Sequence, residues 1–107
     1  MPIIKIFLAQ LPSPAACAAM AEEVESLCVN CMDARSDAVQ LTLHGDSLML
    51  RGAPVLVEVH YRARHDRSAP VMDVFMDALD RMCRRLLGAT PRIRCFAIDQ
   101  ATLFARN

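Results

Sequence analysis

A proline stands at position 2, directly after the initiator methionine, and opens the apolar run from Pro2 to Leu8. If the cell removes Met1, as it commonly does before a small second residue, the nitrogen of Pro2 becomes a terminal secondary amine. Such a nitrogen can lose its proton and act as a base or nucleophile, which the nitrogen of an internal proline cannot do. A free α-amino group titrates near ~8, and burial lowers its pKa because desolvation disfavours the charged form. Pro2 is therefore a candidate catalytic residue, whereas in a chain that keeps Met1 its nitrogen is an amide and cannot be a base.

A group of arginines in one short segment is the second feature with chemical meaning. Arg62, Arg64 and Arg67 lie close together, directly before Ser68. A guanidinium group can bind a carboxylate through two parallel hydrogen bonds, and a cation near Pro2 would further lower its pKa. The alternative interpretation is a charged loop that only faces solvent. As a binding site, the segment predicts a small-molecule carboxylate substrate.

The histidines, cysteines and glycines form no recognisable metal, redox or phosphate site. His44, His60 and His65 do not have the spacing of a metal-binding pair. Cys28 and Cys31 are the only pair with such a spacing, and we interpret them as part of a helix face because no second pair accompanies them. Three glycines are too few for a glycine-rich phosphate loop. We therefore expect no metal and no cofactor.

The first half of the chain has the pattern strand, helix, strand. A nearly continuous apolar run at 2–9 predicts a covered strand, and Ser13 with Pro14 predicts the start of a helix that runs to about residue 32. Alternation of apolar and polar residues at 39–44 predicts a second strand, and 48–50 reads as a short extra strand. The predicted apolar stripe of the helix consists of Ala16, Met20, Val24, Leu27 and Cys31.

The second half repeats this order. A valine-rich run at 55–62 predicts a strand, and Ser68 with Pro70 predicts a helix start. Gly88 predicts the end of the helix, and 93–98 predicts the last main strand. The helix should carry two exposed ion pairs, Asp77 with Arg81 and Asp80 with Arg84. Its predicted buried stripe consists of Val71, Phe75, Leu79, Met82 and Leu86.

This order predicts an α/β (α+β) fold in one domain of 107 residues. Two βαβ units, residues 1–50 and 51–107, would form a four-stranded sheet with both helices on one face. The other face of the sheet would then be bare and apolar. We expect association of subunits to cover this face.

Composition excludes several partners. Acidic and basic residues balance at twelve each, which favours neither a nucleic-acid nor a membrane-surface partner. No segment has the pattern of a signal peptide or the length of a membrane span. Five cysteines, an odd number at apolar or helical positions, indicate reduced thiols and a cytoplasmic location.

An amino-terminal Pro2 on the first strand of a doubled βαβ chain resembles the tautomerase superfamily, which includes 4-oxalocrotonate tautomerase and macrophage migration inhibitory factor. Within it, the chain looks most similar to the DUF1904 family of small uncharacterised bacterial proteins. The shared parts are the strand Val57-Glu58-Val59 that leads into the arginine loop, the helix end Leu86-Leu87-Gly88-Ala89, and the closing strand and tail. The resemblance implies a homotrimer with the sheets packed inward and proline-dependent chemistry.

The resemblance also ranks the three arginines as candidates for binding substrate. Relatives commonly place an arginine and then a serine just before the helix, as in Arg67-Ser68. The spacing from Arg64 to Arg67 is similar to that of the 3-chloroacrylic acid dehalogenases, and the spacing from Arg62 to Arg64 to that of malonate semialdehyde decarboxylase. We therefore expect Arg67 first, Arg64 second and Arg62 third as substrate-binding residues. Gln40 stands where 4-oxalocrotonate tautomerase has an arginine, and the first half of the chain offers no matching arginine.

Three functions are compatible with these features. The leading hypothesis is a tautomerase or isomerase in which Pro2 moves a proton on a keto or enol substrate. If the reaction of this enzyme were instead a dehalogenation or hydration, it would also need a carboxylate to activate water. Asp99 and Glu58 are the only candidates for this carboxylate near strand ends. The alternative is a non-catalytic protein on the same trimeric scaffold with a binding or regulatory role. The third is a ferredoxin-like binding module, whose neighbouring strands are antiparallel.

Overall fold

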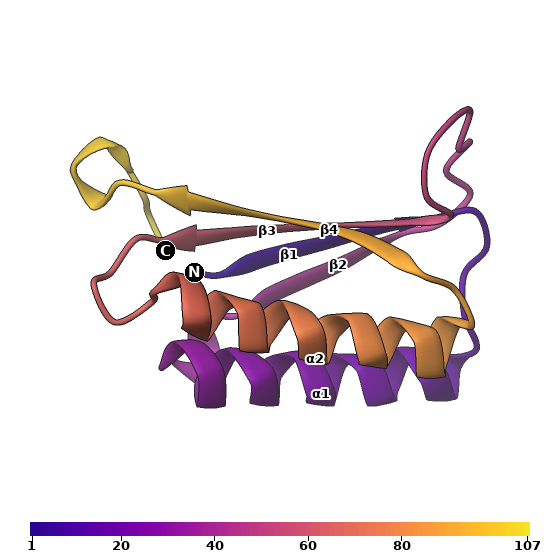
Figure 1. Ribbon diagram of the computed structural model, residues 1–107, viewed down its shortest axis with the longest axis horizontal. Coiled ribbons are helices and arrows are strands. Elements are labelled where there is room, and N and C mark those ends of the chain that lie inside the picture. The colour runs from indigo at the N-terminus through magenta and orange to yellow at the C-terminus, as the bar shows by residue number, and fades with distance from the viewer.

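A four-stranded sheet and two long helices make up the protein (Figure 1). The computed structural model describes all 107 residues. The strands are β1 (Ile3–Leu8), β2 (Gln40–His44), β3 (Val55–Arg62) and β4 (Pro91–Ile98), and the helices are α1 (Pro14–Met32) and α2 (Ala69–Leu87). Two short 3₁₀ segments, η1 (Ser36–Ala38) and η2 (Gln100–Thr102), follow α1 and β4. The predicted fold class is confirmed.

The strands are arranged in the order β2-β1-β3-β4. β1 pairs with β2 in parallel and β3 pairs with β4 in parallel, so each half of the chain is a βαβ unit. The two units join through an antiparallel pairing of β1 with β3, in which Ile3 lies opposite His60. Parallel neighbours within each half exclude the ferredoxin-like alternative.

Local signals place the ends of the helices where the sequence predicts them. The Ser13 side chain accepts a hydrogen bond from the backbone N–H of Ala16 at 3.1 Å and caps α1. Ser68 occupies the equivalent position before α2, but its side chain makes no capping bond. Gly88 ends α2 with φ of 65°, a left-handed conformation that glycine adopts without strain. Asp33 ends α1 in the same region, with φ of 52°.

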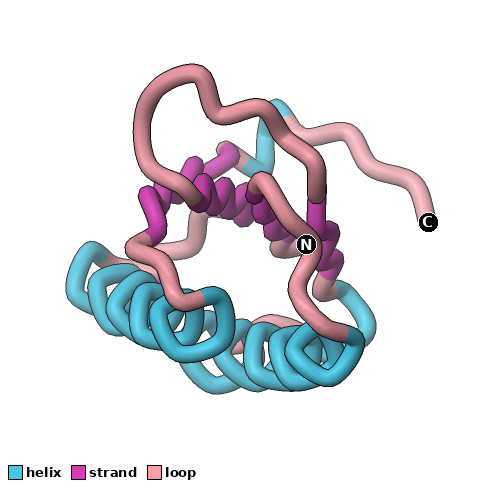
Figure 2. The backbone as a smooth tube through the Cα atoms, turned by 90° about the vertical axis from the view of Figure 1, so that its right-hand side faces the viewer, coloured by secondary structure: helices cyan, strands magenta, loops and turns pink.

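The core lies between the sheet and the helices, and Figure 2 shows these two layers nearly end-on. Side chains of alternate strand residues point into the core, as the period of two requires. The helix stripes differ in part from the prediction because each helix packs on the sheet and also on the other helix. The buried residues of the helices are Met20, Val24, Cys28 and Met32 in α1, and Met72, Phe75, Leu79, Met82 and Cys83 in α2.

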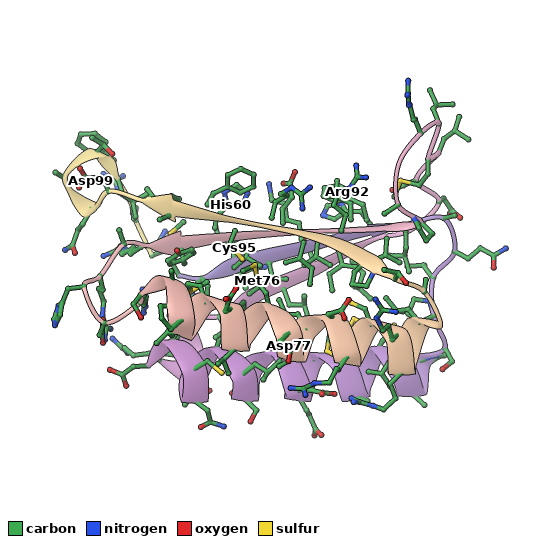
Figure 3. All side chains as sticks on the ribbon, viewed as in Figure 1. His60, Met76, Asp77, Arg92, Cys95 and Asp99 are labelled. Atoms are coloured by element: carbon green, nitrogen blue, oxygen red, sulfur yellow. The ribbon has the colours of Figure 1, made fainter.

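The face of the sheet without helices is not apolar, and this part of the prediction is wrong. Figure 3 shows His60 and Arg92 on the side away from the helices, whereas Cys95 and Met76 lie on the helix side. The period of two along each strand places Lys5, Glu58 and Arg94 on the same face as His60 and Arg92. The apolar residues Ile3, Phe7, Leu56 and Phe96 lie beside these charged residues on the same face. We call this surface the open face.

Residues 48–50 do not form the predicted extra strand. They belong to a loop between β2 and β3 that rises beyond the sheet (Figure 1). Leu48 and Leu50 are 82% and 86% exposed, because this short segment has no neighbouring strand with which to pair. The two ion pairs predicted on α2 are present, with distances of 3.5 Å for Arg81–Asp77 and 3.0 Å for Arg84–Asp80. Neither helix is long and apolar enough to span a bilayer.

Candidate functional site

Several candidate residues from distant parts of the sequence meet at one edge of the sheet. Because β1 and β2 are parallel and β1 and β3 antiparallel, the first residues of β1 and β2 lie beside the last residues of β3. The backbone N–H of Gln40 donates a hydrogen bond to the carbonyl of Pro2 at 3.0 Å. Figure 1 shows the amino terminus next to the end of β3 and the loop that leads to α2. The topology therefore brings Pro2, Gln40 and the arginine segment together.

Pro2 is buried, and Met1 is half-buried. With Met1 present, the nitrogen of Pro2 is an amide, and the amino group of the chain belongs to Met1. The pKa of this amino group is lowered, first by burial and then by the positive charges of Arg62 and Arg67. The end of the chain is thus held in a partly desolvated, cationic environment that favours a neutral amine.

A cleft of about 360 Å³ opens beside the amino terminus. It is lined by Met1, Asp33, Ala34, Arg35, Ala38, Arg62, Arg64, Arg67 and Gln100. All three predicted arginines line this cleft, and each has a different environment. We call it the arginine cleft.

Arg67 is anchored to the backbone. Its Nε donates to the carbonyl of Met32 at 2.9 Å and its Nη1 to the carbonyl of Arg62 at 2.7 Å. Met32 is the last residue of α1, so the guanidinium satisfies a carbonyl that the helix itself leaves without a partner. The pKa of Arg67 is lowered, chiefly by burial and secondly by Arg64. No carboxylate neutralises Arg67, so its charge acts on the cleft.

Arg64 already holds carboxylates of the chain itself. Its Nε donates to Asp66 at 2.9 Å and its Nη2 to Asp33 at 3.1 Å. The hydrogen bonds that Arg64 donates to these two carboxylates raise its pKa, and the bond from Arg64 lowers the pKa of Asp66. A substrate carboxylate would have to displace Asp66 or Asp33 to bind here.

Arg62 is the arginine that has no internal partner. It takes part in none of the ion pairs, and its Nε is buried without a hydrogen-bond partner. It also lines a second cleft of about 480 Å³, together with Met1, Gln40 and the tail that follows η2. Arg62 and Met1 thus stand between two adjoining clefts. The resemblance placed Arg67 and Arg64 ahead of Arg62 as substrate-binding residues, whereas the geometry leaves Arg62 available to a ligand.

Gln40 lines this second cleft and not the arginine cleft. Asp99 and Glu58 line neither. Asp99 caps η2, where its side chain accepts from the N–H of Ala101 at 2.9 Å. Glu58 lies on the open face, 3.5 Å from His60. No group of three or more histidine, cysteine, aspartate or glutamate residues is arranged to hold a metal.

Arg35 and Gln100 line the arginine cleft, and sequence reasoning missed both. Arg35 comes from the first half of the chain, where the resemblance predicts no matching arginine. It lies between α1 and β2 and pairs with Asp37 at 2.7 Å. The position of Arg35 in the sequence could have identified it. It lies in the connection that leads into β2, and because β2 is parallel to β1, this connection ends beside Pro2 at the start of β1.

No family model and no curated protein matches the sequence. Three solved structures illustrate the similarity in fold. A fused 4-OT, described as a wild-type symmetric trimer, is 20% identical with a TM-score of 0.81 over 98% of this chain and 92% of that chain. Pt0534 inactivated by 2-oxo-3-pentynoate is 15% identical with a TM-score of 0.79 over 94% of this chain and 89% of that chain. A macrophage migration inhibitory factor-like protein from Entamoeba histolytica is 7% identical with a TM-score of 0.78 over 98% of this chain and 95% of that chain.

At these identities the likeness is one of fold, and it extends over nearly the whole of each chain. The resemblance to the DUF1904 family stays a prediction. The protein has the fold of the tautomerase superfamily.

Proposed function

We propose that the protein is a tautomerase in which Pro2, uncovered by removal of Met1, transfers a proton on a small keto or enol carboxylate. The observation that carries this proposal is the environment of the amino terminus, in which the pKa of the Met1 amino group is lowered by burial, Arg62 and Arg67. We infer that the same surroundings act on the amine of Pro2 once Met1 is removed. A lowered pKa leaves the amine neutral at a pH where an ordinary α-amino group is still charged. A neutral amine can accept a proton from the substrate.

Each residue of the site has a distinct role in this reaction. The nitrogen of Pro2 removes a proton from one atom of the substrate and returns it to another, so that the reaction is an isomerisation without loss or gain of atoms. Arg62, which has no acid partner, binds the substrate carboxylate. Arg67 supplies a fixed positive charge that stabilises the enolate oxygen. Arg64 positions the loop through Asp33 and Asp66, and Gln40 donates a hydrogen bond to a substrate oxygen.

The proposal includes a homotrimer located in the cytoplasm. Its support is the likeness to a fused 4-OT described as a symmetric trimer, together with the uncovered open face. All five cysteines are free, as expected for a reducing compartment.

A non-catalytic role on the same scaffold is the second candidate. One observation favours it: the fork of Arg64 is filled by carboxylates of the chain. In this case the arginine cleft would bind a carboxylate without converting it.

The first experiment determines whether the amino group of Pro2 is free and nucleophilic. Intact mass shows whether Met1 is absent from protein isolated from its natural host. The protein is then treated with 2-oxo-3-pentynoate, the compound that inactivates Pt0534. The amine adds to the alkyne carbon remote from the ketone, the triple bond becomes a double bond, and the amine proton moves to the adjacent carbon. We expect a gain of one reagent mass at Pro2 and none in Pro2→Ala. Quantitative retention of Met1 in the host refutes the role of Pro2.

The second experiment measures turnover. Ketonisation of phenylenolpyruvate and of 2-hydroxymuconate is followed for the wild type, Pro2→Ala and Arg62→Gln. Arg81→Gln, on the outer face of α2, is the control for a general effect of losing an arginine. Equal rates in all four proteins would refute the assigned roles and favour the non-catalytic alternative.

A further inference from the structure

The open face carries a row of charged residues across the middle of the sheet. Lys5 on β1 lies opposite Glu58 on β3, and Glu58 lies opposite Arg94 on β4. Arg92 is on the same face of β4, two residues from Arg94 and roughly 7 Å along the strand. Within this row each chain therefore presents three cations and one carboxylate, and Arg62 lies on the same face at the end of β3.

These three cations have no acid partner within the chain. None of the ion pairs includes Lys5, Arg92 or Arg94. Arg94 donates only to the carbonyl of its neighbour Ile93, at 2.8 Å. Glu58 is nearest to His60 rather than to either cation opposite it. The arginines on the outer face of α2 differ, because Arg81, Arg84 and Arg85 all pair with acids.

The same surface also has features of an interface. Two pairs of rings stack across neighbouring strands, Phe7 with His44 at 4.6 Å and His60 with Phe96 at 5.1 Å between centroids. Phe96 is 46% exposed, so burial of this surface would remove apolar area from water. Burial of three cations with one carboxylate would be costly unless a negative charge accompanied them.

We propose that the open face binds a phosphate-class oxyanion between copies of the chain. This inference rests on the homotrimer of the proposed function, since three open faces turned to a common axis bring three equivalent sets of Lys5, Arg92 and Arg94 together. Guanidinium groups bind phosphate through paired hydrogen bonds, and lysine adds a compact positive charge. One oxyanion with two negative charges would offset part of the repulsion among the three copies.

The arginine cleft is a competing place for an oxyanion, and the two sites can be separated. The cleft lies at the end of the sheet and depends on Arg62 and Arg67, whereas the charged row lies across its middle. An oxyanion between three copies binds once per trimer, but an oxyanion in the cleft binds once per chain. Stoichiometry and single substitutions therefore distinguish the two sites.

The test compares the chain in inorganic phosphate and in chloride at equal ionic strength and pH. Sedimentation velocity over a range of protein concentrations measures the trimer fraction, and calorimetric titration measures phosphate binding. We expect phosphate to raise the trimer fraction, saturable heat with about one phosphate per three chains, and about tenfold weaker binding in Arg94→Gln. Arg81→Gln, which removes a paired arginine from α2, should bind phosphate as the wild type does.

Four results would overturn the inference. They are a monomer in both salts, a trimer without saturable heat, unchanged binding in Arg94→Gln, and binding once per chain that Arg62→Gln abolishes. The last of these places the anion in the arginine cleft. None depends on turnover, and Pro2→Ala should bind phosphate normally while it loses tautomerase activity. A monomer in both salts would also remove the homotrimer from the proposed function, but the other three results concern this inference alone and leave the proposed reaction at Pro2 unaffected.

Discussion

Arg67→Met removes two hydrogen bonds that connect the segment before α2 to the rest of the chain. The guanidinium donates to the carbonyl of Met32, at the end of α1, and to the carbonyl of Arg62, at the end of β3. Methionine keeps most of the apolar stem of the side chain and loses the charged donors. The substitution therefore isolates the hydrogen bonds from the packing of the stem.

The expected loss of stability follows from these two bonds. A hydrogen bond from a charged donor contributes about 1.5–3 kcal/mol to stability. Burial lowers the pKa of Arg67, which means that folding also carries a desolvation cost that methionine does not have. We subtract this cost and expect a loss of about 2–3 kcal/mol. For a chain of this size, that corresponds to a fall in Tm of roughly 10 °C.

Urea unfolding followed by circular dichroism at pH 7 measures this loss. We expect a lower midpoint at an unchanged slope, because the surface exposed on unfolding stays the same. Arg64→Met is the matched control: its partners Asp33 and Asp66 are more exposed, so its effect should be smaller. A midpoint for Arg67→Met equal to that of the wild type, or higher than that of Arg64→Met, would refute the argument that Arg67 anchors the segment.

Four further outcomes are expected. Arg62→Gln should raise the pH midpoint of kcat/KM. The neutral amine is the base, and the positive charge of Arg62 helps to lower the pKa of this amine. A pH profile of kcat/KM for the wild type and the variant checks this, and a lower midpoint in the variant would contradict it. Cys28 should resist iodoacetamide at pH 8 in the folded protein, since burial raises the pKa of its thiol to about 12; peptide mass mapping detects any labelling. Phe75→Ala should lose about 3–5 kcal/mol of stability in urea, because the ring is fully buried between the helices and the sheet. Gly88→Ala should lose about 1–2 kcal/mol, because φ is 65° although no atom would contact the new methyl group; an unchanged urea midpoint would show that the helix end relaxes.

The open face shows where pattern reasoning failed. The doubled βαβ order places both helices on one face of the sheet, and from this we predicted a bare, apolar face on the other side. Only the pairing of β1 with β3 and of β3 with β4 shows that Lys5, Glu58 and Arg94 form one row. Each residue was visible in the sequence, but the row exists only across strands that are distant in the chain.

The order of the arginines shows a second limit. The resemblance to the superfamily favoured Arg67 and Arg64, but a match in sequence position contains no information about the partners of a side chain. Arg67 binds the carbonyl of Met32 and Arg64 binds Asp33, both more than thirty residues earlier at the end of α1. These contacts leave Arg62 without a partner. The availability of each guanidinium group is therefore a property of the packed structure.

The sequence by itself determined the elements, because their signals are local. Ser13, Pro14 and Gly88 act on the backbone within a few residues, and the alternation of side chains follows from the period of a strand. It also determined that Pro2 would be the amino-terminal residue if Met1 were removed. The tertiary structure alone decided what surrounds this residue. Burial, Arg62 and Arg67 act on the amino terminus through space, and they meet it only because β1 and β3 run in opposite directions at the centre of the sheet.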